Sequence, residues 1–224
     1  MTPRLKVLAS SIGTKLLMSV TGLALVLYLT LHLAGNLLVF FGPVVFNEYS
    51  HALVSNPLVV PAEIGLLAIF LLHVYRAVAM WIDNQRARPV KYVRKEWAGG
   101  ASRKSLASST MILTGAIMLL FVIVHVRTFK YGPEYSVAGS EVRDLYRLEA
   151  ENFSHPITVL LYVLAVTLVG FHLWHGFSSS FQSLGADHPR YTPRIRLIGK
   201  LLAIVIAGGF VVIPLWVYFS GGGS

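Results

Sequence analysis

The stretch PITVLLYVLAVTLVGFHLWHGFSSSFQSLG, residues 156–185, decides the class of fold. Between Pro156 and Phe181 it contains no Asp, Glu, Lys or Arg. As a helix rising 1.5 Å per residue, that span crosses a hydrocarbon core of about 30 Å. It nevertheless holds two imidazoles, His172 and His175. The stretch therefore predicts a transmembrane helix, and ionisable side chains at such depth indicate function.

Four further segments, residues 14–41, 58–82, 106–128 and 196–219, have the same largely apolar character, and with 156–181 they make five. Of the 224 residues 55% are hydrophobic and 13% are charged, whereas a soluble domain has about a quarter charged residues. Lipid leaves the backbone no partner but itself, so each segment should be helical. We predict an all-α integral membrane bundle of five transmembrane helices that forms one domain, residues 1–224. The chain has no cysteine, which excludes disulfides, a covalently attached haem and an iron–sulfur cluster held by this chain.

The basic residues behind the net charge of +9 are concentrated in certain connections between the predicted helices. Lys and Arg gather before the first helix, between the second and third, and between the fourth and fifth, whereas the other two connections are neutral or acidic. The positive-inside rule then places the N-terminus in the cytoplasm and the C-terminus outside, in a multi-pass protein of the cytoplasmic membrane. The basic loops are explained by topology and anionic membrane lipid, not nucleic acid, although docking of a soluble partner stays open.

Residues 45–54 and 140–151 are predicted to form short helices at the outer surface.

The histidines of the first four predicted helices fall at two depths. His32 and His125 lie about 25 Å and about 31 Å beyond the inner ends of their helices. His73 and His172 each lie about 15 Å from the inner end, and His175 about 10 Å from it. His32 therefore pairs in depth with His125, and His73 with His172.

Two imidazoles at one depth on different helices are what bis-histidine ligation of haem b requires, because the iron takes one neutral nitrogen on each face. Zinc fits less well, since no level supplies four ligands. Histidines that hydrogen-bond between helices without a metal, and a proton path, remain open alternatives.

Three charged residues within the helices are tentative members of the site. Arg76 lies one turn inward of His73 on the same face, where it could pair with a haem propionate. Lys15 is a similar candidate with a weaker claim. Glu63, about one turn into the second helix from outside, should be desolvated with a raised pKa, and could exchange protons with a quinone.

Four strings of the sequence resemble a known family. They are SSIGTKLLMSVTGL (10–23), LHLAGNLLVFFG (31–42), FNEYSHAL (46–53) and FHLWHGFSSSFQSLG (171–185). In this order, with one histidine level in each half of the membrane, the chain resembles the single-polypeptide dihaem cytochrome b subunits of succinate dehydrogenase and fumarate reductase. The resemblance covers nearly the whole chain.

The resemblance implies a membrane-anchor and electron-transfer subunit of a succinate dehydrogenase complex. Electrons would pass from succinate oxidation on a flavoprotein subunit, through an iron–sulfur subunit on the cytoplasmic side and two b haems, to a quinone, usually menaquinone. The implied ligands are His32 and His125 for the outer haem, and His73 and His172 for the inner one. In helix four the family spacing of ligand-x-x-x-Gly fits His172 and Gly176, which leaves His175 near a propionate or the partner surface.

Glu63 occupies a place comparable to that of a glutamate which serves menaquinol proton exchange in a dihaem relative.

Two other classes of protein compete with the interpretation of the chain as a succinate dehydrogenase anchor. One is the cytochrome b anchor of another quinone-linked dehydrogenase, such as a hydrogenase or formate dehydrogenase, whose catalytic partner generally faces outward. The other is a haem-free membrane protein that uses its histidines to handle protons.

Overall fold

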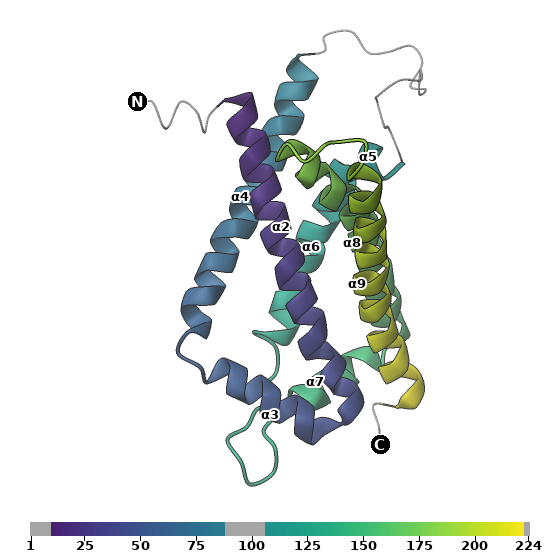
Figure 1. Cartoon of the computed structure of the whole chain (residues 1–224). Coiled ribbons are helices and arrows are strands. Elements are labelled where there is room, and N and C mark those ends of the chain that lie inside the picture. The colour runs from purple at the N-terminus through teal and green to yellow at the C-terminus, as the bar shows by residue number, and fades with distance from the viewer. Residues whose placement is uncertain (1–9, 88–105, 222–224) are drawn as a thin grey trace.

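The computed structural model describes residues 10–87 and 106–221, and no strand occurs within these ranges. Five long helices are joined by shorter ones near the ends of the bundle (Figure 1). The long helices are α2 (Ser11–Asn36), α4 (Val59–Arg86), α6 (Met111–Phe129), α8 (Pro156–Ser183) and α9 (Thr192–Ser220). The short elements are the 3-10 helix η1 (Leu37–Phe41) and the helices α3 (Pro43–Val54), α5 (Leu106–Ser109) and α7 (Leu145–Phe153).

All five long helices are apolar enough, over a sufficient length, to cross a membrane. Their outward faces carry large apolar side chains, among which Leu27, Leu31 and Ile64 are 62%, 63% and 65% exposed. A water-soluble protein rarely exposes such continuous apolar surface, whereas lipid is its natural solvent. The chain is therefore a multi-pass membrane protein with five spanning helices, as the sequence predicts.

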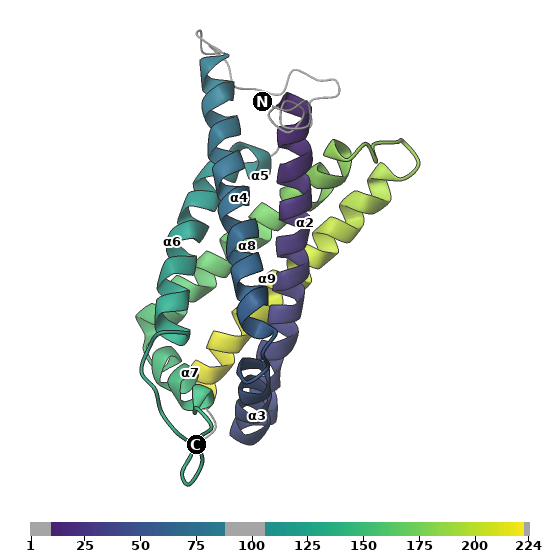
Figure 2. The same ribbon diagram turned by 90° about the vertical axis from the view of Figure 1, so that its left-hand side faces the viewer.

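The long helices alternate in direction along the bundle (Figures 1 and 2). Helices α2, α6 and α9 run one way, and α4 and α8 run back. One end of the bundle holds α5 and the connection between α8 and α9, and the other holds α3, α7 and the end of α9. We call the first the inner end and the second the outer end, in keeping with the predicted topology.

Helices α8 and α9 pack closely along their length because small residues meet at the contact. A Cβ atom at Gly170 would lie 2.8 Å from the Cβ of Ala207, so only glycine permits this approach. Close packing of small residues is a common source of helix association in lipid, where no hydrophobic driving force acts between helices. The α8–α9 pair forms one side of the bundle, and α2 and α6 pack against it.

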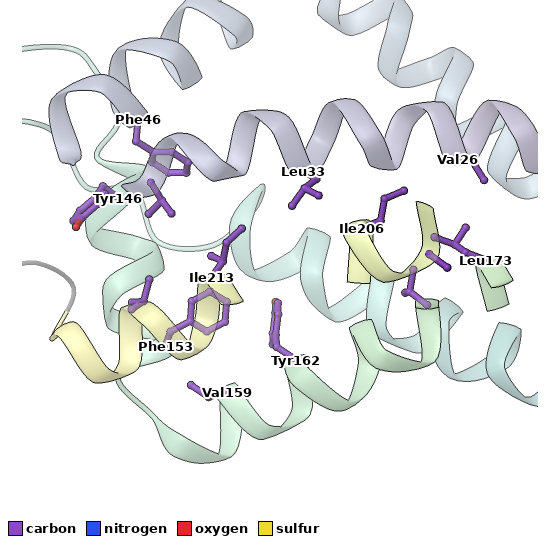
Figure 3. Close-up of a cluster of buried hydrophobic side chains, with 14 residues drawn as sticks. Val26, Leu33, Phe46, Tyr146, Phe153, Val159, Tyr162, Leu173, Ile206 and Ile213 are labelled. Carbon is purple, nitrogen blue, oxygen red and sulfur yellow. The ribbon is translucent and has the colours of Figure 1, made fainter. Parts of the chain in front are cut away.

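The outer end is closed by α3 and α7, which hold each other through polar contacts. The Asn47 amide donates to Asp144 Oδ1 at 2.8 Å and accepts from the Tyr146 backbone N–H at 2.9 Å. Asp144 also caps α7 by accepting from the Arg147 backbone N–H at 3.0 Å. Beneath them Phe153 of α7 meets Tyr162 of α8 with ring centroids 5.0 Å apart, in the cluster drawn in Figure 3.

The two short helices predicted at the outer surface are present as α3 and α7, but the second begins at Leu145 rather than 140. Two of the spanning helices also begin several residues away from the predicted start. The third spanning helix begins at Met111 rather than 106, because the non-helical backbone of Thr110 separates it from α5. The fifth begins at Thr192 rather than 196, with a proline in its first turn, where the missing N–H costs no hydrogen bond.

Candidate cofactor-binding site

The outer pair of histidines comes from α2 and α6. The ring centroids of His32 and His125 lie 5.8 Å apart, with the ring planes at 85°. Tyr28, one turn before His32 in α2, stacks on that ring at 5.4 Å, and Phe210 of α9 lies 5.6 Å from it. The structure thus brings together the outer histidines that the sequence pairs by depth.

Aromatic side chains enclose the second outer ring. Phe121 and Phe129, one turn to either side of His125 in α6, lie 5.6 Å and 5.2 Å from it. The Tyr162 hydroxyl of α8 lies 3.4 Å from His125 Nδ1. This level of the bundle is therefore apolar and π-rich, with one phenol as the polar contact to His125.

The inner histidines come from α4 and α8, and each meets a threonine of another helix. His73 Nδ1 lies 3.1 Å from Thr21 Oγ1 of α2. His172 Nδ1 lies 3.1 Å from Thr114 Oγ1 of α6. The two imidazoles are close enough to each other to interact electrostatically. Four helices therefore contribute one polar side chain each to the inner level.

His175 differs from His172 in its contacts. Its side chain is half-buried and makes no hydrogen bond to another described residue, while its backbone carbonyl accepts from Ser178 Oγ at 3.3 Å. It lies within electrostatic reach of His172. Of the two histidines in α8, only His172 has a ring nitrogen in contact with a side chain of a neighbouring helix, Thr114 of α6, among the described residues.

Two arginines toward the inner end carry a buried nitrogen that lacks a hydrogen-bond partner among the described residues. They are Arg76 of α4, through Nε, and Arg196 of α9, through Nη2. A buried guanidinium nitrogen without an acceptor is costly, which favours an anionic group beside it. Arg76 is the sequence-predicted propionate candidate. Lys15, the other candidate, is exposed near the start of α2.

Glu63 of α4 forms an ion pair with Lys130, at the end of α6, and both side chains are nearly half exposed. Tyr28, which stacks on His32, lies within electrostatic reach of Glu63. The carboxylate is therefore not the isolated, desolvated acid that its sequence position suggests. The ion pair between Lys130 and Glu63 is not predicted from the sequence.

The sequence profile of a family described as "Succinate dehydrogenase/Fumarate reductase transmembrane subunit" matches residues 84–215, more than half of the chain. The chain belongs to this family. No curated protein and no solved structure matches the chain. The family match includes His125, His172 and His175, whereas His32, His73 and Glu63 lie before it and rest on the geometry described above.

Haem b is the cofactor that the cytochrome resemblance implies for this subunit, and the described residues fit it. The imidazoles lie in two pairs, and Nδ1 of His73, His125 and His172 meets a hydroxyl of another helix, whereas His32 Nδ1 meets the Asn36 amide of its own helix. In the three rings whose Nδ1 meets a hydroxyl, Nε2 is left for a metal, and Arg76 offers a donor, unpaired among the described residues, one turn from His73. No group of three or more His, Cys, Asp or Glu that could hold a metal ion occurs in the described ranges.

Sequence reasoning missed the side chains that hold the ring nitrogens of the inner pair and of His125: Thr21, Thr114 and Tyr162. A signal for the threonines was present, because Thr-Gly occurs at 21–22 and again at 114–115 in the subunit. Arg196, the first residue of the predicted fifth helix, is not among the predicted site residues. None of these contacts follows from charge or hydropathy.

Proposed function

We propose that this subunit is the cytochrome b anchor of a succinate:quinone oxidoreductase and holds two b haems. His32 and His125 would ligate the outer haem, and His73 and His172 the inner one. The observation that carries the proposal is the meeting of four imidazoles, one from each of four helices, at two levels of the bundle. Bound haem b supplies reversible one-electron transfer at each level.

The residues of the chain would orient and insulate this path. At His73, His125 and His172 a hydroxyl of another helix meets Nδ1, which would orient the ring and leave Nε2 for the haem iron. Around the outer level, the rings of Tyr28, Phe121 and Phe210 lie against the two imidazoles and would keep water from the haem, which would lower the local dielectric constant. At the inner level Arg76, and His175 or Lys15 beside it, would meet the propionates.

The partners follow from family membership and from the charge distribution. Flavoprotein and iron–sulfur subunits would dock on the cytoplasmic side, where the basic loops face. The connection between the second and third spanning helices, which holds much of this charge, falls largely outside the described residues. With the N-terminus in the cytoplasm and the C-terminus outside, the inner haem would lie on the side of the iron–sulfur subunit.

Quinone chemistry would take place near Glu63. A carboxylate that exchanges protons must be reachable by water and by the quinone, and Glu63 is 46% exposed at the outer end of α4. Lys130 would position this carboxylate, and Tyr28, which stacks on His32, lies within its electrostatic reach. Menaquinone, or another quinone, is the proposed acceptor.

The test is purification of the whole complex from membranes through a tag on this chain. The proposal predicts that flavoprotein and iron–sulfur subunits copurify, that succinate reduces a b-type chromophore in the preparation, and that added quinone reoxidises it. Replacement of His73 by Ala should remove succinate-driven quinone reduction while the three subunits still copurify. A complex that reduces quinone at the normal rate without any haem would contradict the proposal.

A further inference from the structure

The dipeptide Thr-Gly occurs twice in the chain, in two helices that are distant in sequence. Thr21–Gly22 lies in α2 and Thr114–Gly115 lies in α6. Both threonines are buried, with 5% and 4% of their surface exposed. Each dipeptide faces an inner histidine on the spanning helix that follows its own: α2 faces α4, and α6 faces α8.

The contacts repeat atom by atom. Thr21 Oγ1 lies 3.1 Å from His73 Nδ1, and Thr114 Oγ1 lies 3.1 Å from His172 Nδ1. A Cβ atom at Gly22 would lie 3.3 Å from His73 Cε1, and one at Gly115 would lie 3.6 Å from His172 Cε1. In both places the threonine meets the ring nitrogen, and the glycine leaves space for the adjoining ring carbon.

The hydroxyl protons decide which way these hydrogen bonds run. Thr21 Oγ1 donates to the Leu17 carbonyl at 2.7 Å, the usual back-bond of a threonine inside a helix. Thr114 Oγ1 is 3.1 Å from the carbonyls of Thr110 and of Met111. A hydroxyl has one proton, and once a helix carbonyl takes it, the oxygen can only accept from the imidazole.

The imidazole must then carry its proton on Nδ1. A neutral imidazole with a proton on Nδ1 has a bare lone pair on Nε2. That tautomer is the one that binds a metal through Nε2.

We propose that the two Thr-Gly dipeptides are positioning elements that hold both inner imidazoles in the tautomer and orientation required to bind the inner haem iron through Nε2. This inference rests on the proposed function, in which His73 and His172 are the inner ligands. A hydrogen bond from Nδ1–H also makes the imidazole a more basic ligand, so the threonines tune the iron as well as orienting its ligands.

The outer level is built differently. His125 Nδ1 meets a phenol, Tyr162, at the longer distance of 3.4 Å. His32 Nδ1 lies 3.3 Å from the Asn36 amide nitrogen, which already donates to the His32 carbonyl at 2.7 Å. An amide N–H donates and cannot accept a proton from Nδ1. Control by a helical threonine is therefore confined to the inner level, and its loss should affect one haem and spare the other.

The experiment uses the purified complex with Thr21→Val or Thr114→Val, changes that remove the hydroxyl and keep the shape. Thr21→Ser and Thr114→Ser retain the hydroxyl. Thr30→Val is the matched control, because Thr30 also back-bonds in α2, to the Val26 carbonyl at 2.9 Å, but lies on an exposed face. The readouts are haem content, potentiometric titration of the visible spectrum, and low-temperature electron paramagnetic resonance of the ferric haems.

Each valine variant should raise the midpoint potential of the inner haem, because a less basic imidazole stabilises ferric iron less. A tenfold change in the ratio of ferric to ferrous affinity corresponds to about 59 mV for a one-electron couple. Selective loss of the inner haem would be the stronger form of the same result. The serine variants and Thr30→Val should match the wild type.

An unchanged inner potential and spectrum in both valine variants would overturn the inference. So would equal changes at both haems, or serine variants as impaired as the valine ones. Failure of the underlying function would look different. In that case the wild-type complex itself would lack the second haem, whichever residue occupies positions 21 and 114.

Discussion

Glu149 offers the sharpest physical test of the outer end of the bundle. It lies in α7 between Tyr146 and Phe153, on the face packed against the spanning helices, and is 4% exposed. It makes no ion pair with another described residue. Burial raises the pKa of this carboxyl from 4.5 to about 8. The folded protein therefore holds Glu149 protonated at neutral pH, whereas the unfolded chain holds it ionised.

The change to make is Glu149→Gln, which keeps the shape of the protonated acid and removes its titration. At pH 7 the pH lies about 2.5 units above the ordinary pKa of this carboxyl in the unfolded chain, and each unit is worth about 1.4 kcal/mol. The glutamine variant should thus be more stable than the wild type at pH 7, by up to about 3 kcal/mol. At pH 4 the two proteins should have similar stability, since the acid is then protonated in both states.

The sign follows from the raised pKa. The contribution of Glu149 to the free energy of unfolding is most favourable below about pH 4.5. It decreases by about 1.4 kcal/mol per pH unit as the pH rises, and it levels off above about pH 8. The assay is chemical unfolding of the complex in detergent between pH 4 and 9, compared between variants. Glu151→Gln is the control, because Glu151 is exposed, and its hydrogen bonds from Tyr135 and Arg147 lower the pKa of its carboxyl. A pH slope unchanged by Glu149→Gln, or a less stable variant at pH 7, would refute the reasoning.

Three further predictions concern the site. His172→Ala should remove the inner haem, whereas His175→Ala should leave two haems bound; pyridine haemochrome assays of both variants measure this, and the reverse outcome would exchange their roles. Lys130→Met should change stability by less than about 1 kcal/mol, because the Glu63 ion pair is exposed, yet lower quinone reductase activity. The double variant with Glu63→Gln should be no less active than Glu63→Gln alone, and additive losses would show that Lys130 does not act through Glu63. Gly22→Ala should disturb the inner haem spectrum more than Gly115→Ala, since the added methyl meets His73 at 3.3 Å but His172 at 3.6 Å; equal spectra would count against the contact.

The five spanning helices could be predicted from the sequence because membrane burial leaves a long apolar signal that tolerates no alternative backbone. Their ends were less secure. Thr110 interrupts an apolar run without a charge or a glycine, so the break before α6 has no strong local signal. The predicted fifth helix begins at 196, after the basic residue Arg194, whereas α9 has already begun after Tyr191.

The histidine levels could be predicted because depth along a helix is simple arithmetic. The partners of the rings could not, since a threonine in a membrane helix most often serves its own backbone, and only its orientation reveals a second bond. The burial of Glu149 was hidden for a related reason. Its neighbours in sequence are charged, and the apolar face of α7 becomes apparent only when Tyr146, Glu149 and Phe153 are placed on one side of the helix.

The central claim is that this chain binds two b haems between paired histidines. The most direct measurement is the ratio of haem to polypeptide in the complex purified from wild-type cells, with the dithionite-reduced spectrum recorded on the same sample. The account predicts two non-covalent b-type haems per chain, both low-spin. A complex with no b-type absorption, or with only one haem per chain after full cofactor supply, would contradict it.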